Sequence, residues 1–222
     1  KFWTVKHSKE HMNEMLKNIV QIQFTGGEPM IEREHYDILD MAIESKRADQ
    51  INLSYYSNGT FINNKLIEKW KHFKTVNVNL SIDDLYHRYE YQRYGAKWDL
   101  VWKNIRHFKS IESEFLKFNF FPTISVFNIY YMNEYYEKLK DIFYINSSLL
   151  YLPNYYSCKV LPRALKEIIS DRICHILPDV VKYMNDDDWS HLLPQMKSII
   201  KRDDVYRNQS FENVFPEISK YV

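Results

Sequence analysis

The chain has 222 residues, and its 30 Lys or Arg against 29 Asp or Glu leave a formal net charge of +1, which gives no electrostatic reason to expect nucleic acid. A content of 45% hydrophobic and 16% aromatic residues excludes a disordered chain. No apolar run approaches the ~18 residues of a membrane span, and the two cysteines, Cys158 and Cys174, are too far apart for a metal knuckle or a disulfide framework, so we expect a globular protein of the reducing cytoplasm.

Apolar periodicity predicts an alternation of strands and helices along residues 1–160. A first helix, capped by Ser8, precedes strands at 20–24, 50–56, 76–82 and 118–126, with helices between and after them at 32–46, 63–72, 98–111 and 133–143. Residues 147–160 are less regular and hold one or two strands. This order is typical of parallel strands with helical crossovers, as in an α/β barrel or a doubly wound sheet.

Residues 161–222 are predicted to form a helical C-terminal extension packed on the barrel. Leu165, Ile168, Ile169 and Ile173 make a helical stripe. The acidic run 186–188 predicts a helix start, because carboxylates favour helix N-termini. We expect 207–222 to be a tail on the surface.

Two of the chain's four glycines, Gly26 and Gly27, stand side by side after the strand at 20–24 and Thr25, and Glu28 and Pro29 follow them. Glycine is the residue that takes positive φ without steric cost. A strand that ends in two such residues and a carboxylate is typical of a turn that cradles a ligand.

Polar residues follow the other predicted strands as well. In parallel α/β sheets, ligands bind at the carboxyl ends of the strands. This set suits a zwitterionic, hydroxyl-rich small molecule: Glu28 or backbone carbonyls would hold an amine, Arg93 a carboxylate, and Asp83 or Asn58 hydroxyl groups. The further candidates at these strand ends are Ser57, Ser81, Asp84, Ser125 and Asn128.

Three of these segments resemble the motifs of a known family. Phe24-Thr25-Gly26-Gly27-Glu28-Pro29 resembles the GGEP motif of radical S-adenosylmethionine (SAM) enzymes. Ser57-Asn58-Gly59-Thr60 is similar to their TNGT strand end, and Leu80-Ser81-Ile82-Asp83 to their SIDG motif, with Asp84 in place of Gly. The resemblance covers about residues 20–128, with the motifs in order at successive strand ends. The later segments 159–162, 188–190 and 207–217 resemble phage-type radical SAM proteins that carry a twitch or SPASM module.

The resemblance implies a partial (β/α)6 barrel and a [4Fe-4S] cluster that reductively cleaves SAM. The resulting 5′-deoxyadenosyl radical would modify a small-molecule or peptide substrate, with flavodoxin or ferredoxin as the reductant. Gly26, Gly27 and Glu28 would meet the methionine amine, and Ser81 and Arg93 its carboxylate. Asp83 or Asn58 would contact the ribose, and Asn128 the ribose or adenine. Pro29 and Ser57 complete the set of SAM-binding candidates. The phage likeness leaves two origins open, a cellular gene or a viral gene acting in the host cytoplasm.

One element of the family pattern is missing from the sequence. The cluster needs three thiolates in a C-x3-C-x2-C loop, and no such loop occurs here. We expect those cysteines, with the first barrel strand, upstream of Lys1, so that no metal ligand lies in this chain. Cys158 and Cys174 are expected to be small core residues, and Arg88 a surface charge.

Two other functions remain open at this point. The chain could be a catalytically inactive barrel that binds a ligand or a protein partner without redox chemistry. A weaker hypothesis is a nucleotide-sugar enzyme that uses Asp83 and Asp84 with a metal, although a helix cap or a ribose contact suits these carboxylates better than a metal site.

Overall fold

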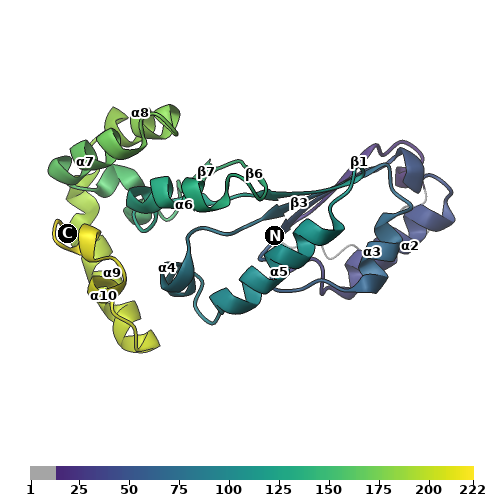
Figure 1. The fold of residues 1–222 in the computed structure, drawn as a ribbon, viewed down its shortest axis with the longest axis horizontal. Helices are drawn as coiled ribbons and strands as arrows, with labels where there is room; N and C mark the ends of the chain where they lie inside the picture. The colour runs from purple at the N-terminus through teal and green to yellow at the C-terminus, as the bar shows by residue number, and fades with distance from the viewer. Residues whose placement is uncertain (1–13) are drawn as a thin grey trace. The chain divides into compact units, whose positions relative to one another are not determined.

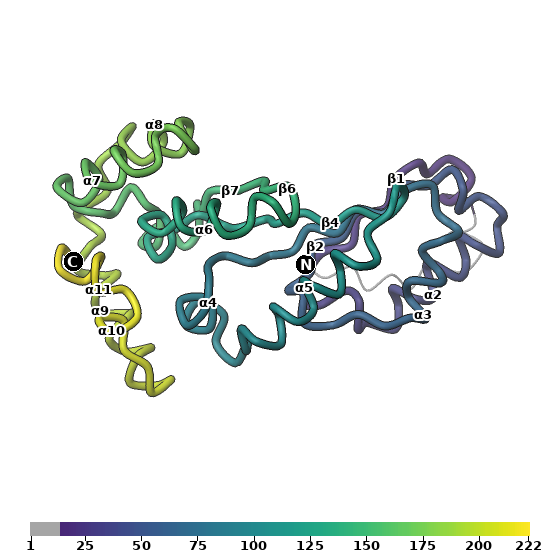
Figure 2. Tube along the Cα trace, in the orientation of Figure 1, coloured from purple at the N-terminus to yellow at the C-terminus, as the bar shows by residue number. Residues whose placement is uncertain are grey.

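The computed structural model describes residues 14–222, and these divide into two compact units (Figures 1 and 2). The first unit contains the residues up to Leu80 and Asn104–Asn119, and the second contains Ser81–Lys103 and Phe120–Val222. The helix predicted after Ser8 lies mostly outside the described residues. Within them, residues 14–16 are helical.

The first unit is built on a sheet with strand order β1-β2-β3-β4. Its strands are β1 (Gln21–Phe24), β2 (Asn52–Ser57), β3 (Thr75–Leu80) and β4 (Leu116–Phe120). β1 pairs with β2 in parallel, with Gln21 beside Asn52, and β2 pairs with β3 in parallel, with Asn52 beside Thr75. Alternate residues of β2 and β3 are fully buried, as expected when one face of a strand packs against helices.

Helices α2 (Arg33–Glu44) and α3 (Asn64–Trp70) lie side by side along this sheet (Figure 1). The short 3-10 helix η1 (Ala48–Gln50) precedes β2. Buried Tyr55 of β2 links the layers: its hydroxyl accepts a hydrogen bond from Trp70 Nε1 at 3.0 Å and lies 2.8 Å from His35 Nε2. Helix α5 (Trp98–Ile111) passes from the second unit into the first, where the Phe108 ring stacks on Phe118 of β4.

The second unit begins where β3 ends and contains a small parallel sheet. Strand β5 (Thr123–Ile124) pairs with β7 (Ser148–Leu149). Strand β6 (Tyr144–Ile145) lies beside Phe120, the last residue of β4, because Asn146 N–H donates to the Phe120 carbonyl. Helix α4 (Tyr86–Gln92) lies before α5, and α6 (Met132–Leu139) connects β5 to β6.

The rest of the second unit is helical, and α9, α10 and α11 gather near the C-terminus (Figure 2). Its elements are the α-helices α7 (Arg163–Ile173), α8 (Pro178–Asp186), α9 (Leu193–Arg207), α10 (Phe211–Val214) and α11 (Pro216–Ser219), and the 3-10 helices η2 (Ile129–Tyr131), η3 (Asn154–Tyr156), η4 (Cys158–Val160) and η5 (Ser190–Leu192).

Most predicted elements are confirmed within a few residues, and the helix at 98–111 matches α5 at both ends. The strand predicted at 118–126 is interrupted, because Pro122, which has no N–H to donate, separates β4 from β5. The sequence analysis missed helix α4.

The acidic run 186–188 lies between two helices: α8 ends at Asp186, and Asp188 Oδ1 accepts from Ser190 N–H at 3.0 Å, at the start of the η5 turn that leads into α9. Carboxylates at a helix C-terminus oppose its dipole, and two buried lysines offset this cost. Lys159 Nζ lies 2.7 Å from Asp187 Oδ2, and Lys166 Nζ lies 3.8 Å from Asp188 Oδ1. The run therefore serves both as the predicted helix start, through Asp188, and as a partner of two buried lysines.

The predicted surface tail at 207–222 is also corrected. It contains α10 and α11, and Phe211, Phe215 and Ile218 are buried. Phe211 lies in α10, Ile218 lies in α11 and Phe215 lies between the two short helices, so each part of the segment contributes a buried apolar side chain. The division at residue 160 into a barrel and an extension stays a prediction.

Candidate functional site

The turn after β1 has the geometry that its two glycines predict. Gly26 and Gly27 have φ of +89° and +46°, and both are exposed. A Cβ at either position would meet no atom within 4 Å. Backbone conformation, rather than crowding, therefore requires glycine here, and the space above the turn is open to a ligand.

Glu28 ties this turn to the turn after β2. Its Oε1 accepts a hydrogen bond from Ser57 Oγ at 2.9 Å, and its Oε2 accepts one from Asn58 N–H at 2.8 Å. Pro29, next to Glu28, is buried. The structure thus brings together Glu28, Ser57 and Asn58, and shows Glu28 fixing the two turns relative to each other.

The turn after β2 is itself held at two points. Asn58 Oδ1 accepts hydrogen bonds from Thr60 N–H at 2.9 Å and from Thr60 Oγ1 at 2.6 Å. Asn104 Nδ2, from α5, donates to the Gly59 carbonyl at 2.9 Å. Such an Asx turn orders backbone N–H groups without help from a ligand.

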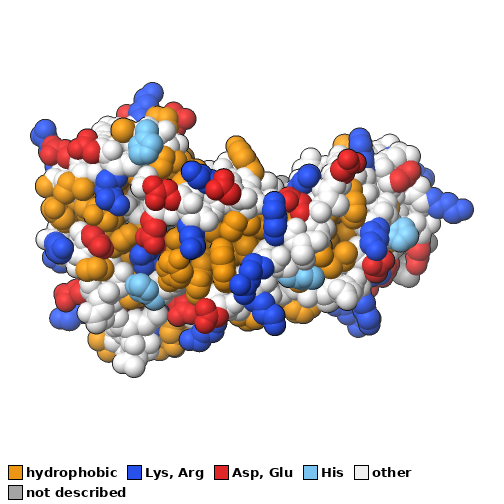
Figure 3. All heavy atoms as spheres, in the orientation of Figure 1, with side chains coloured by type: hydrophobic (Ala, Val, Ile, Leu, Met, Phe, Trp, Pro, Cys, Tyr) orange, Lys and Arg blue, Asp and Glu red, His pale blue; other side chains and the backbone are white. Residues whose placement is uncertain are grey.

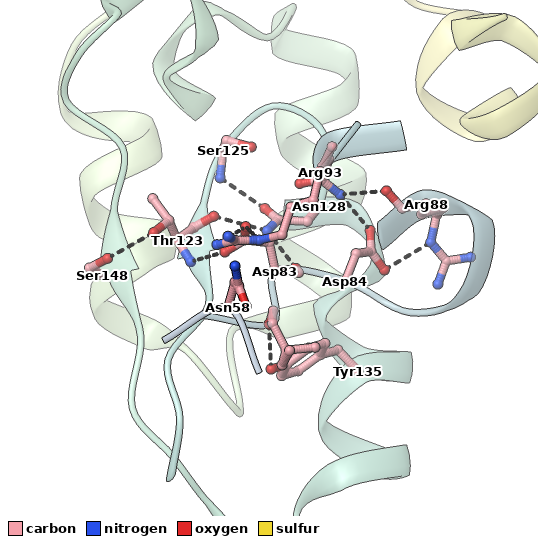
Figure 4. A network of polar contacts seen from close by, with 12 residues as sticks. Asn58, Asp83, Asp84, Arg88, Arg93, Thr123, Ser125, Asn128, Tyr135 and Ser148 are labelled. Atoms are coloured by element: carbon pink, nitrogen blue, oxygen red, sulfur yellow. Dashed lines mark hydrogen bonds and ion pairs between the residues drawn. The ribbon is translucent and has the colours of Figure 1, made fainter. Parts of the chain in front are cut away.

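In the second unit, Asp83 is the centre of a buried polar network (Figure 4). Arg93 Nε and Nη2 both lie 2.8 Å from Asp83 Oδ2, and Thr123 N–H donates to Oδ1 at 2.8 Å. Asn128 Nδ2 donates to the carbonyls of Asp83 and Thr123 at 2.7 and 3.0 Å. Three predicted residues, Asp83, Arg93 and Asn128, are therefore neighbours. Ser81 directly follows β3 and is half-buried.

Burial sets the protonation behaviour of this network. It raises the pKa of Asp83, and the positive charge of Arg93 and the Thr123 N–H oppose the rise. Below it, Tyr135 O–H donates to the Ile82 carbonyl at 2.7 Å, and burial holds the pKa of this phenol well above its usual range. Asp83 therefore holds Arg93 in place, and the remaining N–H groups of Arg93 can donate to the carboxylate of a ligand.

Arg88 was predicted to be a surface charge, and this is wrong. It is only 7% exposed, its Nε lies 3.0 Å from Asp84 Oδ1, and its Nη2 lies 2.6 Å from Glu134 Oε2. Burial raises the pKa of Asp84 to about 7, although Arg88 opposes the rise. Asp83 and Asp84 are each paired with an arginine, which does not favour a metal between them.

Neither cysteine fits the cluster. Cys158 is buried, as predicted, and burial raises its pKa to about 12, whereas iron binding needs the thiolate. Cys174 is exposed, which corrects its assignment to the core. Among residues 14–222, no three His, Cys, Asp or Glu side chains are grouped to hold a metal ion. The residues of this sequence therefore do not supply the three thiolates of a [4Fe-4S] site.

The sequence analysis missed Thr123, whose N–H holds Asp83. The available signal was Pro122, which has no N–H to donate and therefore marks a break in the predicted strand next to Thr123. It also missed the polar residues of α9 that line a cavity beside Asp83, because no local pattern marks them.

A family model described as the radical SAM superfamily matches residues 4–143, more than half of the chain. Among solved structures, the chain is similar to native anSMEcpe with bound AdoMet (TM-score 0.58, 16% identity, 81% of this chain and 52% of that chain covered). It is also similar to native anSMEcpe with bound AdoMet and Kp18Cys peptide (TM-score 0.56, 17% identity, 81% and 53% covered).

This chain spans about half the length of those proteins, and at such identity the likeness shows the fold alone. The comparisons confirm the predicted fold class, an α/β partial barrel of the radical SAM type. A comparison with curated proteins gave no significant match. Within the described part of the chain, no helix has the length and apolar character to cross a bilayer.

Proposed function

This chain belongs to the radical SAM superfamily, and from that premise we propose that it is the SAM-binding part of a radical SAM-type enzyme. The observation that carries the proposal is the open turn at Gly26 and Gly27, with Glu28 fastened to Ser57 and Asn58. AdoMet is bound in the structurally similar anSMEcpe.

Each chemical group of SAM would be bound by residues of complementary chemistry. The exposed backbone of Gly26 and Gly27 would meet the methionine amine through carbonyl oxygens, and the carboxylate of Glu28 lowers the local potential for that cation. Arg93, held by Asp83, would take the methionine carboxylate with Ser81. Asp83 or Asn58 would contact the ribose, and Asn128 the ribose or adenine.

The proposed reaction is reductive cleavage of SAM to a 5′-deoxyadenosyl radical that abstracts hydrogen from a small-molecule or peptide substrate. A [4Fe-4S] cluster would supply the electron, and flavodoxin or ferredoxin would reduce the cluster. Since Cys158 and Cys174 do not fit a cluster, its thiolates would come from outside these 222 residues. The assignment of 161–222 to a twitch-type module stays a prediction.

One observation favours a second candidate function. The absence of a fitting thiolate set from this sequence is what a barrel that binds SAM or another ligand without redox chemistry would show. Iron and sulfide analysis of the protein from its native coding region separates the two, because only the enzyme needs both elements.

SAM binding tests the proposed site itself. We expect Gly26→Val to weaken SAM binding at least about tenfold, since a β-branched residue at this φ is strained by roughly 1–3 kcal/mol and the turn must change to relieve it. The control is Thr25→Val, an isosteric change at the exposed neighbouring position. Equal SAM affinity of Gly26→Val and wild type would contradict the proposed site.

A further inference from the structure

The second unit contains a cavity of about 240 Å³ that the predicted SAM contacts do not account for. Its lining includes the polar residues Asp83, Gln92, Thr123 and Ser125. The other lining residues come from later in the chain: Phe127, Leu150, Tyr156, Asp203 and Arg207, with Tyr91 from α4. The cavity therefore joins the Asp83 network to the C-terminal helix α9.

The apolar wall of the cavity is a cluster of packed aromatic rings. The rings of Phe127 and Tyr156 lie 4.8 Å apart between centroids, and Phe215 packs behind Phe127 and Tyr91 at 5.7 and 5.1 Å. Phe215 lies between α10 and α11 and does not line the cavity, so the segment that joins these helices packs against the wall. On the face shown in Figure 3, hydrophobic side chains also gather over the helices of this unit. A fixed aromatic wall favours a flat apolar or aromatic ligand group.

The charges around the cavity are unequally paired. Asp83 is neutralised by Arg93, and Asp203 Oδ1 accepts from Arg202 Nε and Nη2 at 3.0 and 2.8 Å. Arg207 lies 3.8 Å from Asp203 Oδ2, beyond hydrogen-bond distance, and its guanidinium carbon lies over the Tyr94 ring, 5.4 Å from the centroid. Within residues 14–222, no hydrogen bond engages its guanidinium, which leaves one cation beside the aromatic wall.

From this arrangement we propose that the cavity binds a carboxylate with a single apolar or aromatic group, held by Arg207 and the Phe127–Tyr156 wall. Its volume is below the roughly 300–1,000 Å³ of pockets for drug-sized ligands, so it suits one amino-acid residue. The proposal rests on the proposed function, because the cavity shares Asp83 with the predicted SAM contacts and its ligand is then the substrate. The carboxylate comes from either a free acid or the C-terminal residue of a peptide.

Saturation-transfer NMR and calorimetric titration with N-acetyl-phenylalanine test this site in the full chain. We expect the ring protons to be saturated most strongly, and the corresponding amide to bind at least about tenfold more weakly, the loss typical of one charge-assisted hydrogen bond. A pentapeptide that ends in phenylalanine, with its C-terminal amide, distinguishes the two sources. Acid-selective binding of either probe supports the proposal, and binding of neither overturns it.

Arg207→Gln should abolish the preference for acid over amide, and Arg207→Lys should restore part of it, which shows that the helix still folds. The control is Lys197→Gln, the loss of an exposed charge on the same helix. If Arg207→Gln keeps the full preference, or Lys197→Gln loses it equally, the proposal is wrong.

SAM binding is measured on the same preparations. Selective acid binding without SAM binding leaves the cavity proposal standing and refutes the proposed function. SAM binding without acid binding does the reverse.

Discussion

Replacing Glu28 tests how the two glycine turns are held together. Glu28→Ala removes the acceptor of Ser57 Oγ at 2.9 Å and of Asn58 N–H at 2.8 Å. A hydrogen bond to a charged group contributes about 1.5–3 kcal/mol. Because Glu28 is half-buried and water can replace part of each bond, we expect the free energy of unfolding to fall by about 2–4 kcal/mol.

The isosteric variant Glu28→Gln separates two roles of this side chain. Its amide oxygen can accept from Asn58 N–H, and its amide nitrogen can donate to Ser57 Oγ, so stability should fall by only about 1 kcal/mol. If the charge of Glu28 also attracts the SAM amine, Glu28→Gln will weaken SAM binding severalfold while the turn stays ordered. If Glu28 acts only as a positioning residue, SAM affinity will follow stability and change little.

Urea denaturation and SAM titration measure both effects. The matched control is Glu32→Ala, an exposed carboxylate at the start of α2 whose side chain makes no capping hydrogen bond. Its effect should stay within about 0.5 kcal/mol. The account of the turn is refuted if Glu28→Ala and Glu32→Ala destabilise the protein equally.

Three further predictions concern other buried groups. Burial lowers the pKa of His35 from 6.5 to about 4, so the folded state binds fewer protons than the unfolded one. The free energy of unfolding therefore keeps its full value above pH 6.5 and decreases as the pH falls, by about 2 kcal/mol at pH 5. Urea titrations at pH 7.5 and 5 should show this loss in wild type but not in His35→Gln, and an equal loss in both would refute it. Arg88→Met should cost about 3–5 kcal/mol, because it leaves Asp84 as an unpaired buried charge, and adding Asp84→Asn should recover most of the cost in denaturation. Arg93→Lys cannot keep both contacts to Asp83 and should weaken SAM binding about tenfold, whereas exposed Arg106→Lys should not.

The sequence could predict the parts of the site that are local in the chain. Gly26, Gly27 and Glu28 predict a turn, because a strand pattern, two glycines that can take positive φ and a carboxylate occur within nine residues. The same holds for Asn58 after β2. What each carboxylate contacts was less accessible, since the bond from Glu28 to Ser57 spans 29 residues.

The errors share one physical cause, which is tertiary pairing across long sequence separations. Arg88 looked like a surface charge until folding brought Glu134 to it, 46 residues away. The acidic run at 186–188 does precede a helix start, where Asp188 accepts from Ser190 N–H. The pairing of this run with Lys159 and Lys166 depends on the fold and could not be predicted. No sequence pattern marks Arg207. Its role depends on the fold, in which the nearby carboxylates of Asp83 and Asp203 are already paired with other arginines.

SAM turnover separates the radical enzyme from the non-redox barrel, measured on the protein from its native coding region, prepared without oxygen and loaded with iron and sulfide. We expect SAM to bind and, under a low-potential reductant, to yield methionine and 5′-deoxyadenosine, and we expect Gly26→Val to lose both while Thr25→Val keeps them. A loaded protein that neither binds nor consumes SAM would contradict the account, and binding without turnover would leave the non-redox barrel in its place.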